Sequence, residues 1–264
     1  MLREYLKHLL IRTPLEQPLQ SLRRLAEAPK RRRHPELAEL YAETDRIRIL
    51  MRRVIGPSSH CIDVGAHLGS VLSFMIRLAP KGRHIAVEPL PLKAQWLRKK
   101  FPEVDVQAVS LSDASGELTF FHNLTRSGYS SLLGGGKEGD RVVEIRVPCE
   151  TLDGIVRDRP RVDFVKIDVE GAELKVFGGA LETLRRHRPV VVFECTQDGL
   201  KNFGFRAGQV WECLSNSAGY EVYVVKDLTN GGEPLSEKLF EAAMAYPFRA
   251  FNFVGVPKGF ELPS

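Results

Sequence analysis

The chain from residue 60 onward alternates between two patterns of apolar positions. Short runs rich in β-branched and apolar residues predict strands at residues 60–64, 84–88, 104–109, 163–168 and 190–194. Apolar residues that recur at helical spacing predict helices at residues 70–79, 93–101 and 172–187. This alternation is typical of parallel βαβ units, in which helices cover both faces of one sheet. The pattern therefore predicts an α/β fold with a mostly parallel, doubly wound sheet.

Two further pairs of strands are predicted outside this alternation. Residues 116–121 and 141–149 alternate like antiparallel strands, and the polar, glycine-rich segment 122–140 joins them. Near the end of the chain, residues 219–225 and 251–257 predict a hairpin at one side of the sheet. The 122–140 segment is long enough to be a loop that closes over a bound molecule. A solvated connection within the hairpin is the alternative, and both readings stay open.

The first 58 residues have a different character. Residues 35–55 place apolar residues at helical spacing, whereas the preceding part is broken by proline and contains the basic run KRRRHP. These 58 residues carry 13 Lys and Arg against 7 Asp and Glu, and the remainder of the chain is nearly neutral. We therefore predict a basic helical arm at residues 1–58 and one larger domain at residues 59–264.

The start of this arm is amphipathic. Leu2, Leu6, Leu9 and Leu10 fall on one helical face, with basic residues around it. One reading is a peripheral contact with an anionic membrane surface, to which the basic residues would be attracted. The other reading is packing against the domain or against a second subunit, and the sequence leaves the oligomeric state open.

Composition narrows the class of protein. With 264 residues, 43% of them hydrophobic, the chain can form one large domain and an appendage. Its four cysteines lack the close pairs of a zinc site, which predicts reduced thiols in a cytoplasmic protein. No stretch is apolar enough for long enough to span a bilayer, and the start does not resemble a cleavable signal peptide. Because the basic charge belongs to the arm, we expect no nucleic-acid partner.

Candidate chemistry gathers at the carboxyl ends of the predicted strands, where open α/β sheets bind their ligands. Acidic residues stand at or just past each of these ends. The candidate residues are Asp63, Gly65, His67, Gly69, Glu88, Ser110, Leu111, Asp168, Glu170 and Glu194.

The ends of the first two strands favour an unphosphorylated nucleoside. The Glu88 carboxylate can accept hydrogen bonds from both hydroxyls of a ribose but would repel a 2′-phosphate. The first turn, DVGAHLG, lacks the Gly-x-Gly-x-x-Gly cradle for a pyrophosphate. Among so many carboxylates, the ligand that fits is S-adenosylmethionine, with its adenosine, cationic sulfonium and ammonium. Asp63 would organise the first loop; the alternatives are that it caps the following helix and that Gly69 only permits close packing.

Six segments between about residues 60 and 195 have an order and spacing that match a known family. They are IDVGAHLG, AVEP, SLSDASGELTFF, VPCETLDGI, VDFVKIDVEGAELKVFGGA and VVVFEC, of which KIDVEGAE is the most distinctive part. In these segments the chain resembles the FkbM-type methyltransferases, although His67 stands where such sequences usually have Asn. The resemblance implies S-adenosylmethionine-dependent methyl transfer on a class I Rossmann-like fold. It also implies O-methylation of a hydroxyl on a sugar, glycan or related natural product.

A hydroxyl is a poor nucleophile while it keeps its proton, so a base or a bound cation is expected near the acceptor. Asp168, Glu170 and Glu194 are the candidates, because they lie at adjacent strand ends if the fourth and fifth strands pair. We favour a general base, and a Mg²⁺ site built from these carboxylates remains open. In a third reading, Asp168 accepts from the ammonium of the cofactor while Glu170 caps the next helix.

Two other classes of function remain as alternatives. A nicotinamide-dependent oxidoreductase would use the same fold, but the missing dinucleotide fingerprint argues against it. A non-catalytic binding module with a basic arm would leave the acidic strand ends without a role. The fold alone does not decide between these classes.

Overall fold

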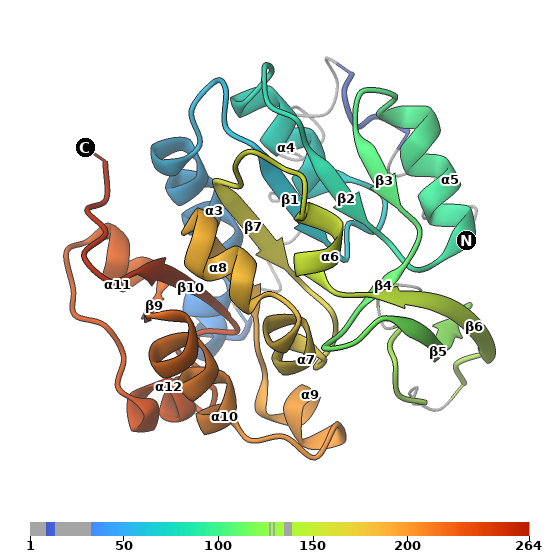
Figure 1. The fold of residues 1–264 in the computed structure, drawn as a ribbon. Helices are drawn as coiled ribbons and strands as arrows, with labels where there is room; N and C mark the ends of the chain where they lie inside the picture. Colours follow the sequence, from blue (N-terminus) through green and yellow to red (C-terminus); the bar gives the residue numbers. More distant parts are fainter. Residues whose placement is uncertain (1–8, 14–32, 127, 129, 135–138, 264) are drawn as a thin grey trace.

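The computed structural model describes residues 9–13, 33–126, 128, 130–134 and 139–263. Its centre is a seven-stranded sheet with the order β3-β2-β1-β7-β8-β10-β9 (Figure 1). The strands are β1 (Cys61–Val64), β2 (Ile85–Val87), β3 (Asp105–Gln107), β7 (Phe164–Ile167), β8 (Val190–Glu194), β9 (Tyr220–Val224) and β10 (Asn252–Pro257). Neighbouring strands from β3 to β8 pair in parallel, whereas β10 is antiparallel to both of its neighbours. The predicted mostly parallel, class I Rossmann-like fold is therefore confirmed.

β9 and β10 form the predicted antiparallel pair. Their order in the sheet differs from their order in the chain. β10 inserts between β8 and β9, so the final strand is interior and β9 forms the edge. The sequence of β10 explains this place, because Phe253, Val254 and Val256 are all buried. A strand that is apolar on both faces is stable only when helices or other strands cover both of its faces.

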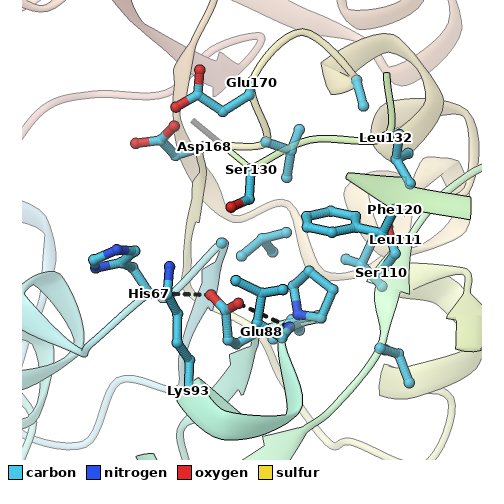
Figure 2. Close-up of a pocket in the computed structure, with 18 of the residues that line it drawn as sticks. His67, Glu88, Lys93, Ser110, Leu111, Phe120, Ser130, Leu132, Asp168 and Glu170 are labelled. Atoms are coloured by element: carbon cyan, nitrogen blue, oxygen red, sulfur yellow. Dashed lines mark hydrogen bonds between the residues drawn. The ribbon is translucent and has the colours of Figure 1, made fainter. Parts of the chain in front are cut away.

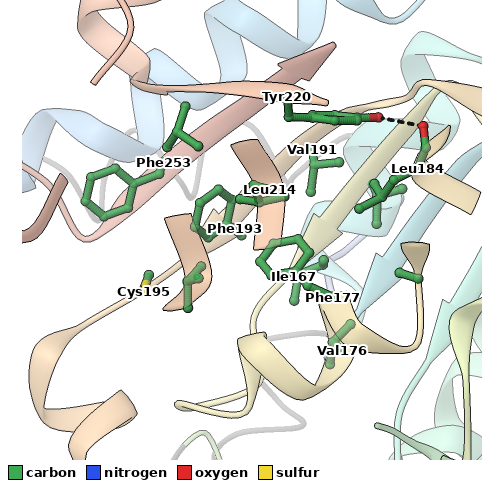
Figure 3. Packing of buried hydrophobic residues seen from close by; sticks show 14 of the residues in the cluster. Ile167, Val176, Phe177, Leu184, Val191, Phe193, Cys195, Leu214, Tyr220 and Phe253 are labelled. Carbon is green, nitrogen blue, oxygen red and sulfur yellow. Dashed lines mark hydrogen bonds between the residues drawn. The ribbon is translucent and has the colours of Figure 1, made fainter. Parts of the chain in front are cut away.

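Helices cover both faces of the sheet. They are α3 (Ala38–Val54), α4 (Ser70–Leu78), α5 (Pro91–Lys100), α6 (Leu152–Val156), α7 (Glu173–Gly178), α8 (Leu181–His187), α9 (Gln197–Asn202), α10 (Ala207–Glu212), α11 (Val225–Thr229) and α12 (Glu237–Ala243), with short turns of other helix types at Pro35–Leu37 and Cys213–Ala218. One core cluster packs α6, α7, α8, α10 and α12 on the sheet, and two others pack α3, α4 and α5 against it. Figure 3 shows the first cluster, in which Phe177 packs edge-on against Phe193 and the Tyr220 hydroxyl donates to the Leu184 carbonyl.

The helix predicted at residues 172–187 is two helices, α7 and α8. The chain passes close to the Ser112 backbone between them, where a Cβ at Gly179 would lie 2.1 Å from the Ser112 oxygen. The Gly179 carbonyl also accepts a hydrogen bond from the Asp153 amide at 2.9 Å. Periodicity could not reveal this break, because the contacts that cause it come from distant parts of the chain.

A second sheet of three strands lies beside the main one. It contains β4 (Ser110–Leu111), β5 (Gly116–Asn123) and β6 (Val142–Glu150), in the order β4-β6-β5. β5 and β6 are antiparallel, as predicted, and Ser131 of the connection between them pairs with Phe121. This small sheet brings Ser110 and Leu111 to the edge at which the strands of the main sheet end.

Part of the predicted basic arm packs on the domain. Leu50 and Met51 of α3 are fully buried in the core, and the buried Glu43 carboxylate accepts hydrogen bonds from the amides of Phe251 and Asn252. Farther towards the N-terminus, Ile11 is buried in the cluster that contains Phe101. Leu2 and Leu6 lie outside the described residues, so the amphipathic face predicted there stays a prediction. Within the described part of the chain, no helix is both long and apolar enough to cross a membrane.

Candidate active site

A cavity of about 210 Å³ opens at the carboxyl ends of β1, β2 and β7. Figure 2 shows Glu88 and His67 at one end of it and Asp168 and Glu170 at the other. We call it the cofactor cavity, because most of the residues predicted to bind the cofactor line it. The candidate residues in its wall are Gly65, His67, Glu88, Ser110, Leu111, Asp168 and Glu170. The fold therefore brings together seven residues that the sequence places in four separate segments.

The turn after β1 is held tightly against β2 and β7. The amides of Gly65 and Ala66 both donate to the Val87 carbonyl, at 2.9 and 3.0 Å. Gly65 has a φ of 77°, and a Cβ there would lie 1.9 Å from the backbone oxygen of Asp168. His67 has a φ of 52°, a left-handed conformation that Asn adopts more readily than most residues. The backbone geometry thus gives a reason for Asn at this position in similar sequences.

Glu88 follows β2 and is only 4% exposed. One carboxylate oxygen, Oε2, accepts from the His67 amide at 2.9 Å, and Oε1 accepts from the Leu90 amide at 3.0 Å. Both backbone donors come from turns that line the cavity, so the carboxylate is fixed in orientation. An ionised carboxylate has about four acceptor sites, so it can accept from more donors than these two backbone amides.

Two cofactor-binding candidates, Asp63 and Gly69, do not line the cavity. Asp63 is 2% exposed and pairs in register with Lys166 on β7, and burial raises the pKa of its carboxyl group to about 7. The backbone of Leu72 in the first turn of α4 opposes the effect of burial on this pKa, and α4 has Gly69 at its N-cap and no side-chain cap. A Cβ at Gly69 would lie 2.4 Å from the Phe101 ring, so close packing requires this glycine.

Much of the remaining wall of the cofactor cavity is apolar. Leu90, Leu111, Phe120 and Leu132 line it, and Phe120 reaches it from the small sheet (Figure 2). Phe120 is buried in a small cluster with Leu90. Lys93 is buried and also lines the cavity, although nothing in the amphipathic pattern of its helix distinguished it.

A second cavity, of about 610 Å³, adjoins the first at Glu170, which lines both. Its wall is formed by the turn after β7, the end of β8, the first turns of α9 and the connection between β5 and β6. Of the predicted catalytic residues, Glu170 and Glu194 line it, whereas Asp168 lines only the cofactor cavity. We call this second space the acidic cavity, because Asp140, Glu170, Glu173, Glu194 and Asp198 line it.

The electrostatics of these carboxyl groups are dominated by burial. Burial, followed by the charges of Asp168 and Glu173, raises the pKa of Glu170 to about 7. Burial raises the pKa of Glu194 to about 8, with the largest further contribution from Asp168. The buried Lys166 ammonium lies 3.6 Å from Asp168 Oδ2 and partly offsets this accumulation of negative charge. A carboxyl group with a pKa near neutrality is suited to take a proton from a reacting hydroxyl.

The sequence analysis did not identify Glu173 as a candidate. Glu173 lies three residues after Glu170, and both residues line the acidic cavity. Its position inside the distinctive KIDVEGAE segment was the available signal. Sequence reasoning also missed α9, which approaches the site because Gly171 and Gly199 touch: a Cβ at Gly171 would lie 2.5 Å from the Gly199 oxygen. No local pattern indicated this contact.

The three carboxylates considered as Mg²⁺ ligands do not form a metal site in the described part of the chain. Among the residues that the structure describes, no group of three or more His, Cys, Asp and Glu side chains is placed to hold a metal ion. Asp168, Glu170 and Glu194 influence one another electrostatically but divide between the two cavities. Their arrangement suits proton transfer better than coordination.

Comparison with known proteins identifies the family. Residues 63–222 match the family described as the methyltransferase FkbM domain. AMB antimetabolite synthetase AmbE of Pseudomonas aeruginosa is 27% identical over 219 residues, which cover 66% of this chain, and the chain spans about 10% of the length of that relative.

Among solved structures, methyltransferase FkbM from Methylobacillus flagellatus has a TM-score of 0.45 and 16% identity, covering 76% of this chain and 44% of its own. A SAM-dependent O-methyltransferase from Thermotoga maritima has a TM-score of 0.42 and 13% identity, covering 83% of this chain and 66% of its own. The family match alone covers more than half of the chain. The protein therefore belongs to the FkbM methyltransferase family.

Proposed function

We propose that the protein transfers the methyl group of S-adenosylmethionine to a hydroxyl of a sugar, a glycan or a related natural product. The observation that carries this proposal is the position of Glu170, which lines both the cofactor cavity and the acidic cavity. A residue at this junction can contact an acceptor hydroxyl at the place where the methyl group arrives.

The residues of the cofactor cavity fit S-adenosylmethionine. Glu88 would accept hydrogen bonds from the ribose hydroxyls, and the apolar wall at Leu111 and Phe120 would contact the adenine ring. The turn at Gly65 brings backbone close to the methionine portion, and Asp168 offers an acceptor for its ammonium. When bound, this cofactor supplies an electrophilic methyl group on a cationic sulfur.

The acidic cavity would hold the acceptor. Glu170 would hold the hydroxyl and accept its proton while the hydroxyl oxygen takes the methyl group, which balances the proton released in the reaction. Much of the remaining increase in the rate of methyl transfer would come from holding the hydroxyl oxygen in line with the methyl carbon and the sulfur. Membership in a methyltransferase family sets aside the oxidoreductase and non-catalytic alternatives.

The test is a single-turnover measurement with methyl-labelled S-adenosylmethionine and a panel of sugars and glycans. Glu170→Gln keeps the size of the side chain but cannot accept the proton, so methyl transfer should fall by about 10²-fold or more. Affinity for S-adenosylmethionine, measured by calorimetry, should change little. Glu117→Gln is the matched control, because Glu117 is an exposed carboxylate on β5 outside both cavities. Unchanged methyl transfer in Glu170→Gln, or no binding of S-adenosylmethionine by the unmodified protein, would contradict the proposal.

A further inference from the structure

Glu173, which lines the acidic cavity, has one carboxylate oxygen without a hydrogen-bond partner in the described part of the chain. Glu173 is 1% exposed and lines this cavity. Its Oε1 atom accepts from the amides of Gly171 at 3.1 Å and Val169 at 3.4 Å. Its Oε2 atom is buried and has no hydrogen-bond partner among the described residues. A buried acceptor left without a donor is destabilising, so a donor from a ligand would complete this site.

The charges around this oxygen favour a cationic donor. Asp140 is paired with Arg126, whose Nε donates to Asp140 Oδ1 at 3.0 Å. Within the described part of the chain, no ion pair involves the four other acidic residues of the wall, which are Glu170, Glu173, Glu194 and Asp198. Lys166 lies nearby but pairs with Asp168, outside this cavity. The wall therefore carries an excess of acidic groups over basic ones.

We propose that the acceptor carries a protonated amine beside its hydroxyl, as an amino sugar does, and that Glu173 and Glu194 bind this ammonium in the acidic cavity. This inference rests on the proposed function, because it assigns the cavity to the acceptor. An ammonium has three donors and can satisfy Glu173 Oε2 and a Glu194 oxygen together. A neutral hydroxyl supplies one donor and leaves the excess of acidic groups uncompensated.

Binding of a cation here would be coupled to proton release. Burial raises the pKa of Glu173 to about 7 and that of Glu194 to about 8, so these groups hold protons readily when no cation is bound. A cation that enters would favour their ionised forms. Hydrogen bonds between ionised partners are also stronger than those between neutral ones.

The ammonium of the cofactor does not account for this site. Glu173 and Glu194 line the acidic cavity and not the cofactor cavity, where Asp168 is the acceptor placed near the turn at Gly65. The two ammonium groups would therefore be bound by different carboxylates.

The experiment compares D-glucosamine with D-glucose, which differ by one amine in place of a hydroxyl. Their affinities for the protein are measured by NMR titration, with and without S-adenosylhomocysteine. Glucosamine should bind about tenfold more tightly, the gain expected for a charge-assisted hydrogen bond. Glu173→Gln keeps Oε1 as the acceptor for Gly171 and Val169 but presents an NH₂ group to the cavity in place of Oε2. In this variant the preference should disappear, and Glu117→Gln should retain it.

Glu194→Gln provides a second variant if Glu173→Gln does not fold, and it should also weaken the preference for glucosamine. Equal binding of the two sugars by the unmodified protein would overturn the inference, as would an unchanged preference in both variants. If S-adenosylmethionine binds and Glu170→Gln lowers methyl transfer while glucosamine has no advantage, the amine inference alone fails. If the preference is present but S-adenosylmethionine does not bind, the proposed function fails and the ammonium site stands.

Discussion

Gly65 and Asp168 touch across the two central strands of the sheet, where a Cβ on Gly65 would lie 1.9 Å from the backbone oxygen of Asp168. β1 and β7 pair in parallel from Cys61 with Phe164 to Val64 with Ile167, so the turns that follow them leave the sheet side by side. This contact joins the loop of the cofactor cavity to the turn that carries the acidic residues. A disturbance at Gly65 should therefore affect both stability and ligand binding.

We expect Gly65→Ala to destabilise the protein by about 3 kcal/mol, because a left-handed conformation and a close contact would both become unfavourable. Urea denaturation measures this loss. Gly56→Ala is the control, because a Cβ at Gly56 meets only Ser59 Oγ at 3.9 Å. Equal stability of the two variants would show that the turn can move away from Asp168.

Glu88→Gln should weaken the binding of S-adenosylmethionine and S-adenosylhomocysteine by about tenfold to a hundredfold. The amide has only one oxygen, so it cannot accept from His67, Leu90 and both ribose hydroxyls as the carboxylate can. Calorimetry with each compound gives the affinities, and Glu117→Gln should match the unmodified protein. Full affinity in Glu88→Gln would place the ribose elsewhere.

Stability should decrease as the pH rises from about 5 to 8 in the absence of ligands. Burial raises the pKa of Glu170 to about 7 and that of Glu194 to about 8, so the folded protein holds protons that the unfolded chain releases. The stabilisation from these raised values is complete below the ordinary carboxyl pKa and is lost as the pH passes the folded values. Thermal unfolding across this range measures the decrease.

The Glu194→Gln variant cannot ionise at this position, so its thermal stability should decrease less between about pH 5 and 8 than that of the unmodified protein. Glu117→Gln should follow the unmodified protein, because Glu117 is exposed. Parallel curves for Glu194→Gln and the unmodified protein would mean that Glu194 titrates as an ordinary surface carboxyl group.

The rate of methyl transfer should rise with pH through about 7, because Glu170 must be ionised to accept a proton. The pH dependence of single turnover, measured with saturating S-adenosylmethionine, locates this step. A profile that stays flat between about pH 6 and 8 would assign proton transfer to another group.

The connection between β5 and β6 should become easier to cleave in Asp140→Asn. The Asp140 carboxylate accepts from Arg126 Nε at 3.0 Å and from Asn123 Nδ2 at 2.8 Å, and Ser131 in the same connection lines the acidic cavity. Loss of the charge removes the ion pair between Asp140 and Arg126, so trypsin should cut after Arg126 several-fold faster. The exposed Glu144→Gln change on β6 is the control, and equal rates in both variants would show that the ion pair does not hold this connection.

Local sequence patterns were sufficient to predict most of the strands and helices and to find the candidate residues at the strand ends. Glu88 and Asp168 were found because a parallel sheet places the carboxyl ends of its strands at one edge, whatever the details of packing. The same argument could not separate Gly65, which lines the cofactor cavity, from Gly69, which packs against Phe101. Both follow the same strand, and only their distant neighbours differ.

The sequence alone was enough to predict the alternation of strands and helices, the family and strand-end carboxylates such as Glu88, because periodicity and turn chemistry act over a few residues. The tertiary structure placed β10 between β8 and β9 and brought Gly171 against Gly199. It also decided that Glu173 and Glu194 face one cavity, with Glu170 at its junction with the cofactor cavity. These relationships depend on contacts between residues far apart in the chain, and the burial that raises the pKa of these carboxyl groups exists only after those contacts form.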